Sequence, residues 1–188
     1  MHLSVFFNGV VFCASMQVAC REVDMSPEQE VSHAQELKQK FWNAFKENPV
    51  IMVGLAIESG VSRPMTAQFL GESASWWFFI TKEGEFFQRF TEDHRAVATY
   101  CAKDHGLFAA VLGRLTLEAD RNMIDRLWNR YVGAWFDGKD DPNLALLRFD
   151  ATSGEIWLKE TGLVAGVKLL LGADPKKEYA DHVARVTM

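Results

Sequence analysis

Two neighbouring stretches of sequence decide how this chain is expected to fold, namely Ser62-Arg63-Pro64-Met65-Thr66-Ala67-Gln68 and Trp76-Trp77-Phe78-Phe79-Ile80-Thr81-Lys82. Their separation is typical of two adjacent strands joined by a short turn. Arg63 offers a forked cation, and Thr66 and Thr81 offer hydroxyls, which are groups that bind phosphate. Phe79 and Ile80 offer a dry surface for a flat ring. The two stretches therefore suit a phosphorylated aromatic cofactor.

The surrounding sequence predicts a fold of the α+β class that is mainly β. Helical spacing predicts helices over 37–45, 86–90 and 123–135. Apolar and β-branched runs predict strands at 50–57, around Arg63, and at 76–81, 96–101, 107–117, 144–149 and 156–158, of which the last two form a hairpin. About six antiparallel strands with flanking helices fit an antiparallel split β-barrel, because no strand-helix-strand alternation supports a parallel sheet.

Composition limits the classes of protein to which the chain can belong. Its 188 residues, 48% hydrophobic and 24% charged, suffice for one sizeable core, so residues 25–188 are predicted to form a single domain. The formal net charge of -5 and the lack of a Lys/Arg-rich run argue against nucleic acid and favour a small-molecule partner. Cys13, Cys20 and Cys101 are odd in number and lack CxxC spacing, which indicates a reducing compartment, and we expect the cytoplasm.

Residues 1–24 form an N-terminal extension outside this domain. Leu3 to Cys20 is apolar and uncharged, but it lacks the basic start of a secretory signal and is too interrupted for a membrane span. Met25 opens an ordinary start, with Ser26 as a helix cap and Pro27 at the first helical position. A mis-called upstream start is therefore preferred over a signal-like segment, and no membrane partner is expected.

Together, these motifs make the chain resemble the pyridoxamine 5'-phosphate oxidase-like FMN-binding split-barrel family, specifically its general stress protein 26 branch. The resemblance runs from about Leu37 to the C-terminus. It rests on the order and spacing of Arg63-Pro64-Met65-Thr66-Ala67-Gln68, Trp77-Phe78-Phe79, Leu127-Trp128-Asn129, Ala134-Trp135-Phe136, Asp140-Asp141-Pro142, Glu155-Ile156-Trp157 and Ala165-Gly166-Val167-Lys168-Leu169-Leu170-Leu171-Gly172.

The resemblance implies a flavin cofactor, FMN in preference to FAD, held between the two subunits of a homodimer. In this family the arginine-containing strand and the next strand hold the cofactor phosphate and the ring edge. A tryptophan of the final hairpin lies near the cofactor in pyridoxamine phosphate oxidases, which matches Trp157, and the basic residue beyond it corresponds to Lys168. The predicted cofactor-binding residues are Arg63, Met65, Thr66, Gln68, Phe79, Ile80, Thr81, Lys82, Trp157 and Lys168.

The chain departs from the oxidase pattern at Gly84-Glu85-Phe86-Phe87, where the family places an Arg-Lys pair that grips the phosphate. Pyridoxamine phosphate oxidase activity itself is therefore not expected. The predicted function is a stress-related, flavin-dependent redox role with an unknown small-molecule electron donor or acceptor. The alternatives are a non-catalytic protein that holds flavin or another planar ligand, and a dimeric scaffold whose pocket has lost its ligand.

Other residues that attract attention are assigned structural roles. The tryptophans at 76, 77, 128 and 135 are expected to anchor the core or the dimer interface. Asp140-Asp141-Pro142 reads as a turn rather than a metal pair, so no metal site is predicted. No side chain stands out as a catalytic acid or base.

Overall fold

The computed structural model describes residues 27–56, 62–71, 73–90, 93–159 and 183–188. The predicted extension over residues 1–24 lies outside these ranges. None of the helices in the described ranges has the length and apolar character needed to cross a membrane. In chain order the elements are α1 (Pro27–Glu47), β1 (Val50–Leu55), β2 (Ser62–Thr66), β3 (Ser75–Thr81), α2 (Glu85–Arg89), β4 (Asp93–Cys101), β5 (Leu107–Glu118), α3 (Arg121–Leu127), the 3-10 helix η1 (Val132–Ala134), β6 (Leu144–Leu158) and β7 (Val183–Thr187).

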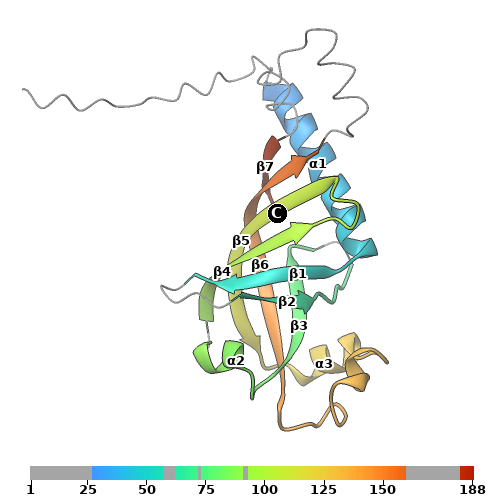
Figure 1. Cartoon of the computed structure of the whole chain (residues 1–188), viewed down its shortest axis with the longest axis vertical. Helices are drawn as coiled ribbons and strands as arrows, with labels where there is room; N and C mark the ends of the chain where they lie inside the picture. Colours follow the sequence, from blue (N-terminus) through green and yellow to red (C-terminus); the bar gives the residue numbers. More distant parts are fainter. Residues whose placement is uncertain (1–26, 57–61, 72, 91–92, 160–182) are drawn as a thin grey trace, which may run out of the picture.

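The strands form one antiparallel sheet in the order β2-β1-β4-β5-β6-β3 (Figure 1). The first half of β6 pairs with β3, and its second half pairs with β7. No strand ladder closes the sheet within the described residues. Instead, a bridge joins the ends of β2 and β3, in which Gln68 N donates to Trp77 O at 2.8 Å and Trp77 N donates to Gln68 O at 3.1 Å. The predicted fold, a mainly β split barrel with a few helices, is confirmed.

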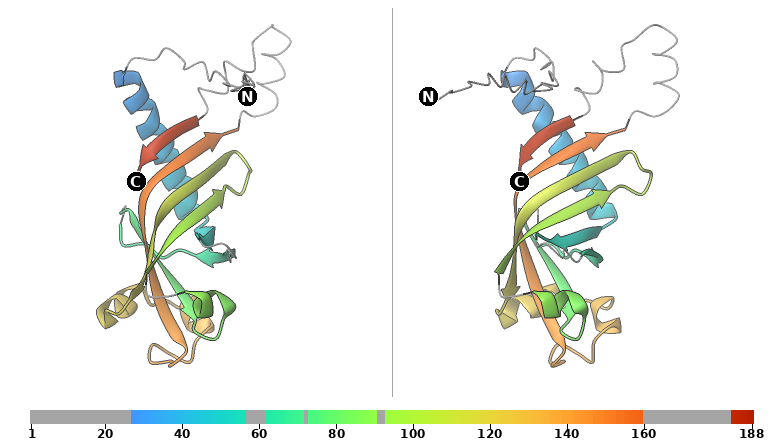
Figure 2. Two further views of the ribbon diagram at one scale, coloured as in Figure 1. Left: turned by 90° about the vertical axis from the view of Figure 1, so that its left-hand side faces the viewer. Right: turned by 60° about the vertical axis from the view of Figure 1, so that its left-hand side comes forward.

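Helix α1 covers one side of the sheet because its apolar residues recur at helical spacing. Phe41 and Phe45 are fully buried, and the ring of Phe45 packs edge-on against Trp76 of β3, with centroids 4.9 Å apart. The hydroxyl of Tyr100 on β4 donates to the carbonyl of Ala44 at 2.7 Å, which ties the end of the helix to the sheet. Figures 1 and 2 show α1 along the upper part of the sheet, with α2 and α3 at its other end.

The last predicted hairpin is wrong, because residues 144–158 form the single long strand β6. The stretch expected to turn stays in the sheet: Gly154 is buried, and the hydroxyl of Thr152 donates to the carbonyl of Leu112 at 3.1 Å. A register shift between Leu112 and Gly113 lets β5 follow β6 along its whole length. β7 is not among the predicted strands and adds a seventh strand to the sheet.

The long helix predicted after β5 is interrupted. α3 ends at Leu127, and η1 follows as a separate turn. The side chain of Asn129 explains the break, because its Oδ1 accepts from the backbone N–H groups of Tyr131 at 3.0 Å and Val132 at 3.1 Å. These bonds offer the backbone an alternative to continued helix.

Gly113 lies at the register shift between β5 and β6. A Cβ atom on this residue would lie 2.5 Å from the carbonyl oxygen of Asp150 and 2.5 Å from Cζ of Phe149. The ring of Phe149 in turn stacks on Trp76, with centroids 5.1 Å apart. Glycine is required here because the backbone of β6 and a core ring approach this position closely.

Candidate functional site

A cavity of about 370 Å³ lies between β2, β3 and the chain segment that follows α3. The antiparallel bridge between Gln68 and Trp77 brings the ends of the two strands together beside it. Its lining combines one arginine, two threonines and a glutamine with apolar and aromatic side chains. The lining residues are Arg63, Pro64, Met65, Thr66, Gln68, Phe79, Ile80, Thr81, Tyr131, Val132, Trp135 and Phe136.

Most of the predicted cofactor-binding residues line this cavity. They come from β2, from the residues just after it and from β3. Met65 and Ile80 are buried and form the inner wall, whereas Thr66 is exposed. The predicted residues that the structure brings together here are Arg63, Met65, Thr66, Gln68, Phe79, Ile80 and Thr81.

Arg63 supplies the positive charge of the cavity. No described carboxylate forms an ion pair with its guanidinium. The side chain occupies space beside Gly84, since a Cβ atom on Gly84 would lie 3.2 Å from Nη1 of Arg63. A guanidinium that has no carboxylate partner among the described residues, and that shares its cavity with Thr66 and Thr81, can bind an anion through charge-assisted hydrogen bonds.

Two predicted residues, Lys82 and Trp157, do not line the cavity, and a third lies outside the described residues. Lys82 is exposed, and its Nζ donates to the carbonyl of Pro142 at 2.7 Å. Trp157 lies in the second half of β6, where it pairs with Phe108 of β5 on one side and with β7 on the other. Lys168 lies outside the described residues.

The sequence analysis missed the aromatic wall formed by the segment after α3. Tyr131 and Trp135 line the cavity yet remain 69% and 84% exposed. Trp135 therefore does not anchor the core of the subunit, and the alternative, an anchor at a dimer interface, stays a prediction. These residues were assigned to a helix because their spacing matches the helical period. Asn129 and Gly133 were the available signals against that helix, since both residue types are unfavourable in a helix interior.

Asn129 also connects this wall to β2. Its Nδ2 donates to Oε1 of Gln68 at 2.9 Å and to the carbonyl of Leu127 at 3.2 Å. Together with the two bonds that its Oδ1 accepts from backbone N–H groups, the side chain of Asn129 makes four hydrogen bonds within the described structure. The side chain of Asn129 therefore helps to hold the aromatic wall beside β2.

The tripeptide Asp140-Asp141-Pro142 lies in the turns that lead into β6, as predicted. The carboxylate of Asp141 accepts from the backbone N–H of Asp137 at 3.0 Å and of Asn143 at 2.8 Å. These two bonds lower the pKa of Asp141. Across the described ranges, no group of three His, Cys, Asp or Glu side chains is arranged to hold a metal ion.

Comparisons with known proteins agree with this architecture. The family model for pyridoxamine 5'-phosphate oxidase-like proteins matches residues 36–179. The chain belongs to this family. The resemblance stated from the sequence motifs is thereby confirmed.

Three relatives of this pyridoxamine 5'-phosphate oxidase-like chain are general stress proteins. The crystal structure of the general stress FMN/FAD binding protein from Xanthomonas citri is 44% identical, with a TM-score of 0.63 over 68% of this chain and 92% of that chain. A candidate general stress protein 26 from Jannaschia sp. CCS1 is 27% identical, with a TM-score of 0.67 over 82% and 99%. General stress protein 26 of Bacillus subtilis (strain 168) is 35% identical over 43 residues, which span 23% of this chain and 31% of that relative.

The start of α2 shows what this pyridoxamine 5'-phosphate oxidase-like chain has in place of the Arg-Lys pair. Phe86 is fully buried in the core, and Glu85 forms an exposed ion pair with Arg89 at 3.0 Å. These positions therefore serve packing and helix stability. Among the described lining residues, Arg63 is the one permanent cation of the cavity.

Proposed function

We propose that this chain binds a flavin, FMN in preference to FAD, in the cavity between β2 and β3, and uses it in a stress-related redox role. The observation that carries the proposal is that a guanidinium with no carboxylate partner among the described residues lies in one cavity with two threonines and an apolar, aromatic wall. The volume of about 370 Å³ falls within the usual range for small-molecule sites. The binding of FMN/FAD by the Xanthomonas citri relative supports a flavin as the ligand.

The residues present fit a flavin mononucleotide in chemical type. Arg63, Thr66 and Thr81 would bind the phosphate, since a guanidinium fork and hydroxyls are phosphate ligands. Phe79 and Ile80 would cover the isoalloxazine ring and exclude water from it. A bound flavin would supply the electron transfer to or from a small-molecule partner.

The lining contains no carboxylate, imidazole or thiol within the described residues. Tyr131 is its one proton-transfer candidate, and it is 69% exposed. This composition also favours a second candidate function, a non-catalytic protein that holds flavin. Oxidation of reduced nicotinamide by the flavin-loaded protein distinguishes the two: steady turnover favours the redox role, and its absence favours the binding role.

The test of the flavin site is an absorption spectrum between 300 and 500 nm before and after FMN is added and excess is removed. A retained band with shifted maxima is expected. Arg63→Ala should raise the dissociation constant of FMN by roughly tenfold to a hundredfold, and that of riboflavin much less, because riboflavin lacks the phosphate. Arg114→Ala, at an exposed ion pair with Asp93, is the matched control. Equal FMN affinity in the Arg63 and Arg114 variants would refute the assignment.

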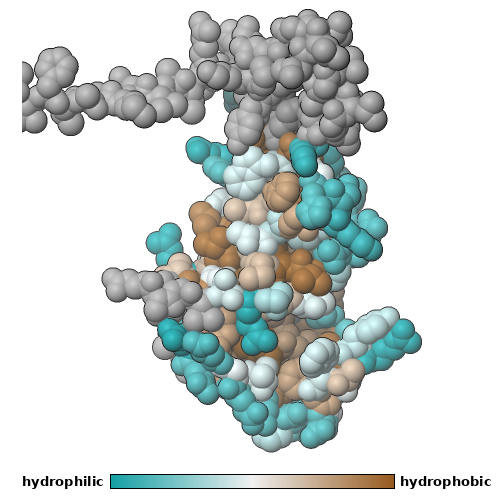
Figure 3. Space-filling model, viewed as in Figure 1, coloured by the Kyte–Doolittle hydropathy of each residue, from teal (hydrophilic) through white to brown (hydrophobic). Residues whose placement is uncertain are grey.

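We further propose that two copies associate through the face of the sheet that α1 does not cover. Val50, Met52, Phe108 and Leu112 project from β1 and β5 and remain 38% to 50% exposed. Figure 3 shows hydrophobic side chains gathered over the middle of the molecule. An apolar surface of this kind on a sheet is typical of a protein interface.

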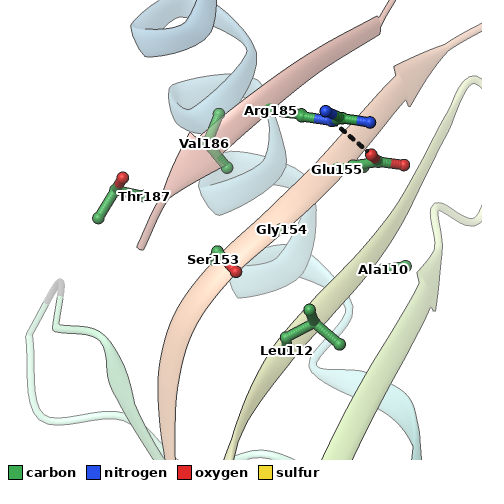
Figure 4. A pocket seen from close by; sticks show the side chains of 8 residues that line it. All are labelled: Ala110, Leu112, Ser153, Gly154, Glu155, Arg185, Val186 and Thr187. Carbon is green, nitrogen blue, oxygen red and sulfur yellow. Dashed lines mark hydrogen bonds and ion pairs between the residues drawn. The ribbon is translucent and has the colours of Figure 1, made fainter.

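A groove of about 540 Å³ continues this face across β5, β6 and β7 (Figure 4). An ion pair of 2.8 Å between Arg185 and Glu155 spans β6 and β7 in it. Trp157 lies two residues beyond Glu155 and so on the same face of β6. Burial of this face in a dimer would place Trp157 at the interface. The groove is lined by Ala110, Leu112, Ser153, Gly154, Glu155, Arg185, Val186 and Thr187.

The cavity and the proposed interface adjoin. Met52 is the register partner of Pro64, and Val50 is the register partner of Thr66, so two cavity residues border the apolar face. Light scattering on a sizing column should give a dimer for the wild type and a monomer for Leu112→Arg. Val31→Arg changes an equally apolar residue on α1, 59% exposed, and should leave the dimer intact. A monomeric wild type at micromolar concentration would refute the dimer.

The proposed compartment is the cytoplasm. The odd number of cysteines and the lack of CxxC spacing support a reducing environment. Fractionation of cells that express the full chain, followed by immunodetection, tests this placement, and recovery outside the cytoplasmic fraction would overturn it.

A further inference from the structure

The hydrogen bonds of Asn129 determine which end of the Gln68 amide faces the cavity. Oδ1 of Asn129 accepts from two backbone N–H groups, those of Tyr131 and Val132. A backbone N–H can only donate, so the oxygen of the Asn129 amide must lie on that side. Its Nδ2 is thereby directed at the carbonyl of Leu127 and the side chain of Gln68.

The same reasoning fixes the next amide. Since Nδ2 of Asn129 can only donate, the atom of Gln68 that it meets at 2.9 Å must be the carbonyl oxygen Oε1. Nε2 of Gln68 is then the free end, and within the described residues it has no hydrogen-bond partner. Gln68 lines the cavity. The N–H groups of Tyr131 and Val132 therefore fix the amide of Asn129, and Asn129 in turn leaves Nε2 of Gln68 as a donor toward the cavity.

We propose that Asn129 is a positioning residue that holds Gln68 as a hydrogen-bond donor toward the cavity, and that this donor selects a ring edge bearing acceptors. The inference rests on the proposed flavin function. The isoalloxazine edge carries several acceptors, two carbonyl oxygens and two ring nitrogens among them, and a single N–H donor. A fixed donor therefore favours flavin over planar ligands that offer only donors, because an unpaired polar group in a closed site lowers affinity.

Asn129→Asp tests the orientation without removing the turn. One carboxylate oxygen of the variant can still accept from the N–H groups of Tyr131 and Val132, but the other cannot donate to Gln68. The amide of Gln68 must then rotate, donate Nε2 to the new carboxylate and turn its oxygen toward the cavity. Asn43→Asp introduces the same charge at an exposed site on α1 and serves as the matched control.

The first readout needs no flavin. In the nitrogen-15 spectrum of the ligand-free protein, the side-chain NH₂ of Gln68 should exchange with solvent freely in the wild type and in Asn43→Asp. Asn129→Asp should slow that exchange roughly fivefold or more, because the NH₂ group gains an ionised acceptor. A Gln68 NH₂ group that is equally protected in the wild type and in Asn129→Asp would overturn the proposed orientation.

The second readout is affinity for FMN and riboflavin. Asn129→Asp should raise both dissociation constants by a similar factor, roughly tenfold, because the lost donor acts on the ring. A loss confined to FMN would indicate repulsion between the new carboxylate and the phosphate, and would overturn selection by the donor. In a Gln68→Met background, Asn129→Asp should change either dissociation constant less than twofold. A further tenfold rise in that background would show that Asn129 acts independently of Gln68.

The outcomes separate this inference from the proposed function. A wild type that shows free exchange at Gln68 but binds no flavin refutes the proposed function and retains the orientation. A wild type that binds flavin, with Asn129→Asp unchanged in both readouts, refutes the inference alone. Should Asn129→Asp fail to fold, Gln68→Glu replaces it: one oxygen keeps the bond from Asn129, the cavity loses its donor, and riboflavin affinity should fall by the same factor.

Discussion

Replacement of Gly113 by alanine tests the packing between β5 and β6. The added Cβ would lie 2.5 Å from both the carbonyl oxygen of Asp150 and Cζ of Phe149, whereas ordinary contact begins at 3.4 Å. Backbone and ring must therefore separate by about 0.9 Å, the difference between 3.4 and 2.5 Å. Neither neighbour can yield freely, because Asp150 belongs to the β5–β6 ladder and Phe149 is stacked on Trp76.

The expected loss is about 3 kcal/mol, at the upper end of the usual cost of overpacking a core. For a chain of this size that loss lowers the melting temperature by about 6 to 12 °C. Urea unfolding followed by circular dichroism measures it. Gly154→Ala, whose Cβ would lie 3.1 Å from the carbonyl oxygen of Ala110, is the matched control and should cost clearly less. Equal stability of the two variants would refute the argument from close approach.

Three further predictions concern the helix contact, the turn before β6 and the aromatic wall. Tyr100→Phe removes the bond to Ala44 and should cost about 1 kcal/mol at pH 7. Burial raises the pKa of Tyr100. The stabilising effect of its hydroxyl is therefore complete below about pH 10 and is lost as pH rises through the folded-state pKa. In alkaline melts, the difference in melting temperature between Tyr100→Phe and the wild type should shrink accordingly. Backbone hydrogen bonds lower the pKa of Asp141. The wild type should therefore be more stable than Asp141→Asn above about pH 4, and the difference should vanish as pH falls through the folded-state pKa. A difference in stability that persists in acid melts contradicts this. Trp135→Ala should leave the melting temperature nearly unchanged, because the residue is 84% exposed, yet weaken FMN binding about threefold to tenfold; unaltered titrations would remove Trp135 from the site.

The strands that build the cavity could be predicted because their sequences carry local signals. β2 and β3 are short, apolar on at least one side and bounded by turn residues. The turn after β1 correctly predicts that β1 pairs with β2, whereas β3 pairs with β6 and meets the chain after β2 through the bridge between Gln68 and Trp77. Arg63 and Thr81 stand out within these strands because a guanidinium and a hydroxyl are groups that bind phosphate. The resemblance to the family then implied that these residues bind one cofactor.

The remainder of the site depends on contacts between segments far apart in the sequence. A bond between Asn129 and Gln68, residues separated by 61 positions, helps to hold the aromatic wall beside the cavity, and no local period in the sequence reveals such a bond. β6 was divided into two strands because its small and polar residues resemble a turn, although β5 pairs with it throughout. Trp157 and Lys168 rest on the resemblance to the family.

Gln68 contributes both to the bridge between β2 and β3 and to the cavity, which links opening of the barrel to exchange of the ligand. Its backbone forms the bridge to Trp77 between the free edges of the sheet, and its side chain lines the cavity. A seam held by two backbone bonds opens with a smaller free energy than the ladders on either side of it. We expect a bound flavin to slow deuterium uptake at Trp77 N while leaving the amides of the β4–β5 ladder unaffected, so that uptake at this one amide would report how often the barrel opens to release its contents.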